Sequence, residues 1–133
     1  MSRRHLLLLA AAVTDSTFER TTLDGQRAWI GKCLHCGSKL VVRDDGRAMG
    51  DATLEHIWPV TRGGGNDLHN LAVACGRCNR EKGKRHDHKK GENLDDLVVA
   101  LRARRELRWR DPEAVGMTAR LAKLDEPEPG DAD

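Results

Sequence analysis

Residues 54–83 read LEHIWPVTRGGGNDLHNLAVACGRCNREKG, and this stretch decides the fold. Within thirty residues it holds a Glu-His pair at positions 55–56, the asparagines Asn70 and Asn79, and the pair Cys75-x-x-Cys78. The pattern predicts a metal clamp that holds the fold and a separate polar cluster that can do chemistry. We therefore interpret the rest of the chain as support for this stretch.

A second Cys-x-x-Cys pair lies upstream, so the four cysteines are enough for a closed tetrahedral Zn²⁺ site. The expected zinc ligands are Cys33, Cys36, Cys75 and Cys78. The loop between the two pairs contains the whole polar cluster, so closing the zinc site would hold that cluster at both ends. The alternative, buried or redox cysteines, lacks the βαβ pattern that usually accompanies a redox Cys-x-x-Cys.

Composition points to one small domain that gains from a metal staple. The chain has 133 residues with one Phe and no Tyr, which leaves little aromatic material for a core. The formal net charge of +2 favours no particular partner. Residues 77–90, however, carry seven Lys or Arg against two Asp or Glu, whereas residues 111–133 carry two against seven. The basic segment is a candidate surface for a polyanion, or else a solvated helix face.

Periodicity and turn residues predict a small α+β domain. We expect two short strands around Ala28–Ile30 and Lys39–Val42, a brief strand that ends at the Glu-His pair, and a strand from Leu71 to Ala74 that leads into a helix near Cys75. An amphipathic helix with an Arg-rich outer face is expected from Asn93 to about Trp109, and a weaker helix over 113–124. We expect four segments. Residues 1–28 form an N-terminal helix and a link with a turn at residues 24–25, and residues 29–91 form a zinc-stapled core. Residues 92–124 form C-terminal helices, and residues 125–133 form an acidic disordered tail.

The N-terminal segment imitates a secretory signal, with a basic front and an apolar run from Leu6 to Val13. It is too short for one, and far below the roughly 20 residues that span a bilayer. We expect a short helix that packs on the core and a cytoplasmic, unsecreted protein. Paired cysteines with none left over are also more natural for a metal site in a reducing compartment.

The residues make sense as a hydrolytic site. A neutral histidine can deprotonate water, and a hard divalent ion held by oxygen ligands can stabilise phosphate charge. Because successive side chains on a strand face opposite sides, His56 and Glu55 should point apart. Asn79 follows a zinc ligand on a clamped helix, where its amide oxygen can complete a metal site.

The series Glu55-His56-Ile-x-Pro, Gly63-Gly64, Asn70-Leu and Cys-x-x-Cys-Asn79-x-x-Lys-Gly resembles the HNH endonuclease family, whose fold is a treble-clef-like ββα-metal motif framed by four zinc cysteines. The resemblance covers about residues 33–83. It implies that His56 is the general base and that Asn70 positions it. Glu55 and Asn79 would bind the catalytic ion, although Asp is the commoner residue before the histidine.

The resemblance implies a nuclease that hydrolyses DNA, leaves 5′-phosphate and 3′-hydroxyl ends, and uses a structural Zn²⁺ with a catalytic Mg²⁺, Mn²⁺ or another divalent ion. DNA is favoured over RNA as the partner, no membrane is involved, and a protein partner could supply specificity. The expected phosphate contacts are Arg77, Arg80, Lys82, Lys84 and Arg85. The alternative is a non-catalytic zinc module that binds nucleic acid or a protein. The target sequence, nicking against double-strand cutting, the preferred ion, the oligomeric state and the setting, such as phage packaging, restriction or homing, are left open.

Overall fold

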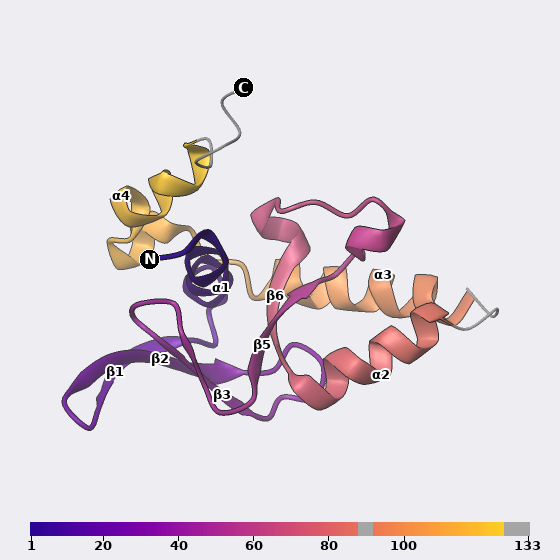
Figure 1. Ribbon diagram of the computed structural model, residues 1–133, viewed down its shortest axis with the longest axis horizontal. Coiled ribbons are helices and arrows are strands. Elements are labelled where there is room, and N and C mark those ends of the chain that lie inside the picture. The colour runs from indigo at the N-terminus through magenta and orange to yellow at the C-terminus, as the bar shows by residue number, and fades with distance from the viewer. Residues whose placement is uncertain (88–91, 127–133) are drawn as a thin grey trace.

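The computed structural model describes residues 1–87 and 92–126, apart from the side chains of residues 85–87 and 92–93. The predicted acidic tail of residues 125–133 lies outside this range from residue 127 onward. Helices and strands are mixed, with two antiparallel sheets, so the predicted α+β class is confirmed (Figure 1). The division of the chain into four segments stays a prediction.

A four-stranded sheet occupies the N-terminal half. It contains β1 (Glu19–Leu23), β2 (Gln26–Lys32), β3 (Lys39–Arg43) and β4 (Ala48–Met49), in that order. The predicted turn at Asp24-Gly25 joins β1 to β2, and both of its residues have positive φ, as a tight hairpin of this type requires. Strand β1 was not expected, because its polar residues give a weak strand signal. Pairing with β2 holds it there as an edge strand.

A second, two-stranded sheet carries the decisive stretch. Strand β5 (Ala52–His56) pairs antiparallel with β6 (Leu71–Cys75), and His56 lies opposite Leu71. Helix α2 (Gly76–Asp87) follows β6 directly, which completes the predicted β-β-α order. All five residues of β6 are buried, so the strand fixes the site from inside the core.

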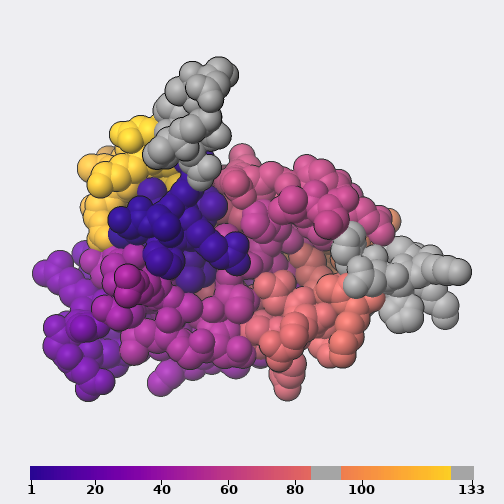
Figure 2. All heavy atoms as spheres, in the orientation of Figure 1, coloured from indigo at the N-terminus to yellow at the C-terminus, as the bar shows by residue number. Residues whose placement is uncertain are grey.

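Helix α1 (Arg3–Val13) confirms the short N-terminal helix. Its N-cap is Ser2, whose side chain accepts a hydrogen bond from the backbone N–H of His5. Residues 6–13 are all buried and pack against β3, β5 and β6. Figure 2 shows α1 (indigo) held between the strands and the C-terminal helices. No helix in the described part of the chain is long and apolar enough to cross a membrane.

Helix α3 (Glu92–Leu107) lies beside α2 (Figure 1), with Arg102 and Arg104 exposed as expected from the sequence but Arg105 inside the core. Arg105 is fully buried and donates to the carbonyl oxygens of Leu71 at 2.7 Å and Thr14 at 2.8 Å. Arg104 donates to the carbonyl of Leu34 at 2.6 Å. The expected outer face thus holds for Arg102 and Arg104 but not for Arg105, because arginine can leave water when backbone carbonyls satisfy its donors.

The C-terminal region breaks into short pieces instead of the weak single helix expected over residues 113–124. These are the 3-10 helix η3 (Pro112–Val115), the one-turn helix α4 (Thr118–Leu121) and the 3-10 helix η4 (Ala122–Asp125). Gly116 ends η3 with a φ of 69°, a left-handed conformation that stops a continuous helix. Met117 and Leu121 are buried and fix these pieces against the core.

Candidate functional site

The four cysteines meet at one point between the knuckle of residues 33–36 and the junction of β6 with α2. All four Sγ atoms lie within 4.8 Å of one another, and the Sγ atoms of Cys36 and Cys75 are 3.9 Å apart. A tetrahedral zinc ion with Zn–S bonds of about 2.3 Å requires Sγ atoms about 3.8 Å apart. The cluster therefore fits the predicted structural zinc.

Backbone amides support these sulfur atoms, as they do around metal-bound thiolates. The N–H groups of His35 and Cys75 point to Cys33 Sγ at 3.4 and 3.3 Å, and the N–H of Cys78 points to Cys75 Sγ at 3.4 Å. Hydrogen bonds from Ser38 lower the pKa of the Cys36 thiol to about 6. At neutral pH this sulfur is already a thiolate, the form that binds zinc.

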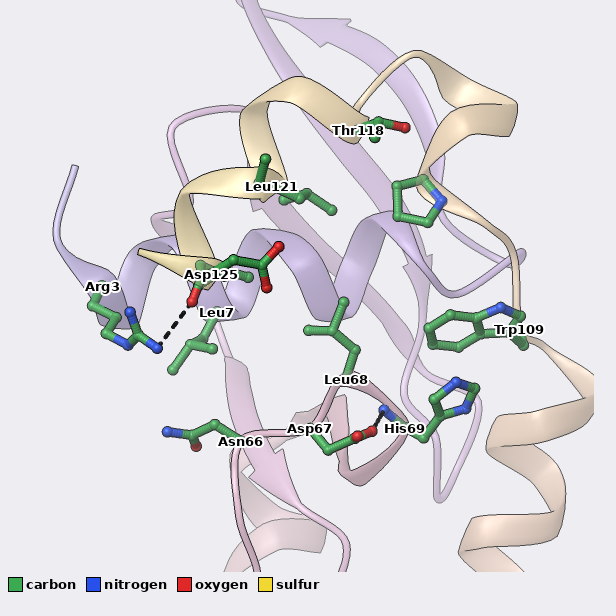
Figure 3. A pocket seen from close by; sticks show the side chains of 13 residues that line it. Arg3, Leu7, Asn66, Asp67, Leu68, His69, Trp109, Thr118, Leu121 and Asp125 are labelled. Carbon is green, nitrogen blue, oxygen red and sulfur yellow. Dashed lines mark hydrogen bonds between the residues drawn. The ribbon is translucent and has the colours of Figure 1, made fainter. Parts of the chain in front are cut away.

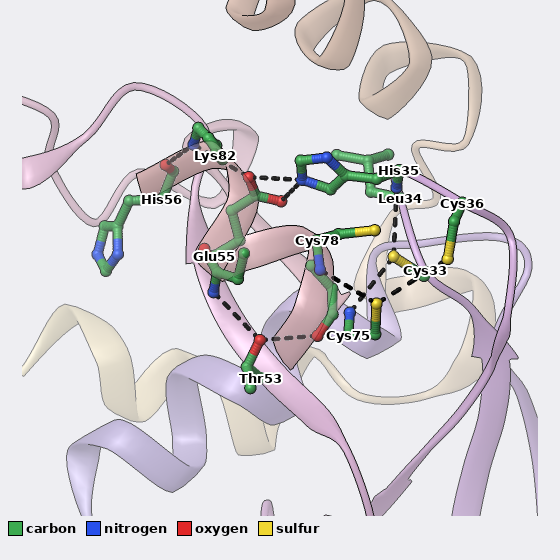
Figure 4. Close-up of polar contacts among 12 residues, drawn as sticks. Cys33, Leu34, His35, Cys36, Thr53, Glu55, His56, Cys75, Cys78 and Lys82 are labelled. Carbon is green, nitrogen blue, oxygen red and sulfur yellow. Dashed lines mark hydrogen bonds and ion pairs between the residues drawn. The ribbon is translucent and has the colours of Figure 1, made fainter. Parts of the chain in front are cut away.

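Glu55 does not face the solvent. Its side chain is 1% exposed, and its carboxylate accepts hydrogen bonds from His35 Nε2 at 2.7 and 2.8 Å and pairs with Lys82 Nζ at 3.0 Å (Figure 4). Burial raises the pKa of the Glu55 carboxyl, but the His35 hydrogen bond and the Lys82 charge outweigh it, so the pKa lies below its ordinary value. The carboxylate is thus ionised and held from both sides.

His35 sits between two zinc ligands, and its bond to Glu55 links the zinc knuckle to the end of β5. The sequence analysis assigned His35 no role. The sequence offered one indication of this role, the position of His35 between Cys33 and Cys36, because a residue there lies close to the strand that packs against the knuckle, which is β5.

His56 points away from Glu55, as strand alternation predicts (Figure 4). Its Nε2 atom lies 2.8 Å from Oδ1 of Asn66. An amide oxygen only accepts hydrogen bonds, so Nε2 carries the proton and Nδ1 keeps the lone pair. Asn66, which the sequence analysis missed, therefore orients the imidazole and selects its tautomer.

Asn70 acts on the backbone around His56. Its Oδ1 accepts from the N–H of Trp58 at 2.8 Å, and its Nδ2 donates to the carbonyls of Trp58 at 3.1 Å and Gly65 at 2.9 Å. Its own carbonyl accepts from the N–H of Ile57 at 2.8 Å. These four bonds tie the chain after His56 to the chain before Asn66.

Asn79 lies near His56 on the first turns of α2. Its Nδ2 donates to Thr53 Oγ1 at 3.1 Å and to the carbonyl of Leu54 at 3.3 Å. Both residues line one open pocket of about 220 Å³, together with Pro59 and Lys82. Because the described bonds of Asn79 use its nitrogen, the amide oxygen is available to a ligand in this pocket.

The basic residues expected to contact phosphate divide into two groups. Arg77, Arg80 and Lys84 are exposed on α2, and the side chain of Arg85 lies outside the described residues. Lys82 is 4% exposed, and its Nζ donates to the carbonyl of His56 at 2.6 Å as well as to Glu55. Its ammonium group links Glu55 to the end of β5, and Lys82 also lines the pocket of His56 and Asn79. A phosphate contact from Lys82 stays a prediction.

The glycine-rich loop of residues 62–66 is a tight turn held by its own backbone. The N–H groups of Gly63 and Gly64 both donate to backbone carbonyls within the loop, to Val60 and Pro59 respectively, at 2.9 Å. A Cβ on Gly64 would lie 1.7 Å from the carbonyl oxygen of Trp58. Gly64 is thus required for a tight turn, and these two amides are already used.

Comparison with known proteins agrees with this geometry. Residues 33–85 match the HNH endonuclease family. The match starts at the first zinc cysteine and includes every site residue described above, so the resemblance drawn from the sequence is confirmed. No curated protein and no solved structure gives a significant match.

The HNH family implies a catalytic divalent ion, and the oxygen donors suit a hard one. Asn79 fits by position, because its amide oxygen is available at the pocket. Glu55 fits by chemistry, but both of its oxygens are engaged by His35 and Lys82. Glu55 also does not line the pocket that Asn79 lines, so an ion bound by both residues would require Glu55 to move toward the pocket.

Proposed function

We propose that the protein is an HNH endonuclease that hydrolyses phosphodiester bonds in DNA. The observation that carries this proposal is the pocket of about 220 Å³ that His56 and Asn79 share, with the imidazole held by Asn66. A base and an oxygen ligand that meet at one open pocket are what phosphodiester hydrolysis needs. The match of residues 33–85 to a nuclease family supports the same reaction.

In this proposal His56 is the general base. Nδ1 takes a proton from the attacking water, and the Nε2–H to Asn66 bond stabilises the resulting imidazolium. Asn70 positions His56 through bonds to the backbone of the two residues that follow it and to Gly65, which precedes Asn66. Asn79, with Glu55 behind it, would hold Mg²⁺ or Mn²⁺, and such an ion would neutralise charge on the phosphate and the leaving oxygen.

Binding of DNA would use the exposed cations of α2. Arg77, Arg80 and Lys84 lie on the helix that also carries Asn79, and Arg85 follows them. Phosphate contacts release counterions, so affinity should fall steeply with salt, with a log–log slope of about −0.9 for each phosphate neutralised. Specificity for sequence is not expected from these contacts alone.

The test is cleavage of supercoiled plasmid by the zinc-loaded protein. We expect nicking with Mg²⁺ or Mn²⁺ and none without an added divalent ion, because the oxygen donors at the pocket suit a hard ion. Matched DNA and RNA substrates decide the preferred nucleic acid. A folded, zinc-containing protein that cuts neither substrate with any ion would favour the alternative, a non-catalytic zinc module that binds nucleic acid or a protein.

Replacing Asn66 tests the orientation of the base. We expect Asn66→Ala to lower kcat roughly 10- to 100-fold, since loss of an orienting partner typically costs that much at such a site. Asn66→Asp keeps an acceptor oxygen and should recover most of the rate, with the acidic limb of the pH–rate profile displaced to higher pH because the new charge favours the imidazolium, which cannot act as a base. Equal rates for Asn66→Ala and the parent protein would show that the imidazole is oriented without this bond.

A further inference from the structure

A larger pocket, of about 470 Å³, lies between α1, the loop before β6 and the C-terminal helices (Figure 3). Leu7, Leu68 and Leu121 give it an apolar lining. Its polar lining includes Asn66, Asp67 and Asp125. The nuclease reaction as described above makes no use of this pocket. Its volume and mixed lining lie within the range of small-molecule binding sites.

Asn66 connects this pocket to the candidate active site. The same side chain that lines the pocket bonds His56 Nε2 at 2.8 Å. Only the side chain of Asn66 would therefore separate a phosphate at His56 from this pocket. A group inside the pocket would be attached to DNA at or next to the phosphate that is attacked.

The charges of the pocket disfavour a phosphate. Asp125 directs its carboxylate toward the interior, and Asp67 lies at the lower edge (Figure 3). Arg3 also lines the pocket, but its guanidinium donates to the carbonyl oxygens of Leu124 at 3.2 Å and Glu126 at 3.3 Å. Carboxylates beside apolar walls suit a neutral ring that bears amino groups, such as a nucleobase.

One wall of the pocket is rigid. The rings of His69 and Trp109 stack with centroids 3.9 Å apart, Arg105 lies over the Trp109 ring at 5.1 Å, and Glu106 accepts from His69 Nδ1 at 2.7 Å. These aromatic rings are therefore held in place before any ligand arrives. A guest would pack against their edges and the leucine side chains without first ordering the pocket.

We propose that this pocket receives an unpaired nucleobase next to the phosphate at His56. The protein would then select DNA with an extrahelical or single-stranded base over fully paired DNA. A base in a duplex cannot reach such a pocket without leaving the stack, and an unpaired base does so at the least cost. The position of the phosphate rests on the proposed function, whereas binding of the base does not require cleavage.

The test uses a duplex with one bulged 2-aminopurine, whose fluorescence reports its surroundings, and the same duplex fully paired. Binding is measured without added divalent ion, so that no cleavage occurs. We expect the parent protein to bind the bulged duplex at least 10-fold more tightly. Thr118→Trp, which places an indole at the pocket, should reduce this preference to 2-fold or less. Ala119→Trp, at the next exposed position of α4 outside the lining, should keep it.

Zinc content and the melting temperature establish that both variants are folded. Equal affinity of the parent protein for the two duplexes would overturn the proposal, as would equal preferences in Thr118→Trp and Ala119→Trp. The two proposals fail separately. A protein that prefers the bulge but cuts no DNA refutes the nuclease alone, and one that cuts plasmid without any preference for the bulge refutes the base pocket alone.

Discussion

His56→Ala is expected to reduce plasmid cleavage by about 10²- to 10⁴-fold, the range that a positioned general base contributes. The ring is partly exposed and its one described bond goes to Asn66, so its loss leaves no buried group without a partner. Zinc content, melting temperature and affinity for DNA should therefore stay near those of the parent protein. Single-turnover cleavage with saturating protein measures the chemical step without interference from product release.

His5→Ala is the matched control, because His5 lies on α1, far along the chain from the HNH segment, and does not line the pocket of His56. We expect it to cut at the parent rate. If His56→Ala also kept the parent rate, another group would have to act as the general base. The tautomer of His56 selected by Asn66 would then have no effect on the rate.

The parts of the site that depend on local pattern were predictable. Strand alternation separates Glu55 from His56 whatever the rest of the chain does, and paired Cys-x-x-Cys motifs predict a metal cluster from ligand chemistry alone. The order strand, loop, strand, helix around residues 52–87 followed from the same signals. Helical periodicity also located α3 correctly to within two residues at its C-terminus, where Trp109 was expected and Leu107 is found.

The parts that depend on long-range contacts were not predictable. Asn66 is one polar residue in a glycine-rich loop, and only closure of that loop brings it to His56. His35 reaches Glu55 across 20 residues of sequence. Lys82 belongs to a basic run that is normally solvated, yet its side chain is buried and pairs with Glu55. The sequence shows which side chains are charged and need partners, but it does not show which residues pair with one another.

Two arginines from the C-terminal part of the chain bind the backbone of the zinc knuckle. Arg104 donates to the carbonyls of Leu34 and His35, and Arg108 to those of Lys32 and Cys33, at 2.6 to 3.4 Å. The knuckle is therefore held by arginines in and just after α3, and its cysteines lie in the cluster that fits a zinc ion. His35 passes the same constraint to Glu55, so the fold of the clamp and the position of the polar cluster depend on each other.

Removal of zinc is accordingly expected to unfold the protein. Structural zinc supplies about 10–16 kcal/mol of apparent binding free energy, which equals or exceeds the roughly 5–15 kcal/mol that stabilises a small domain. A zinc-selective chelator should abolish the near-ultraviolet circular dichroism and the cooperative thermal transition, and added zinc should restore both. Chelation in the presence of excess Mg²⁺ gives the control, because a catalytic ion that remains available cannot rescue a lost structural one.

Cys36→Ser and Ser38→Ala distinguish the contribution of zinc to stability from that of the hydrogen bonds within the knuckle. Cys36 is an exposed ligand, so its loss removes a Zn–S bond without opening a core cavity, and we expect a large fall in zinc affinity and melting temperature. Ser38→Ala removes only the side-chain hydrogen bond that is the largest cause of the lowered pKa of Cys36, and it should cost much less at neutral pH because zinc itself favours the thiolate. A zinc-free protein that melts at the temperature of the loaded one would mean that the arginine contacts alone hold the knuckle, and that the metal is dispensable for the fold.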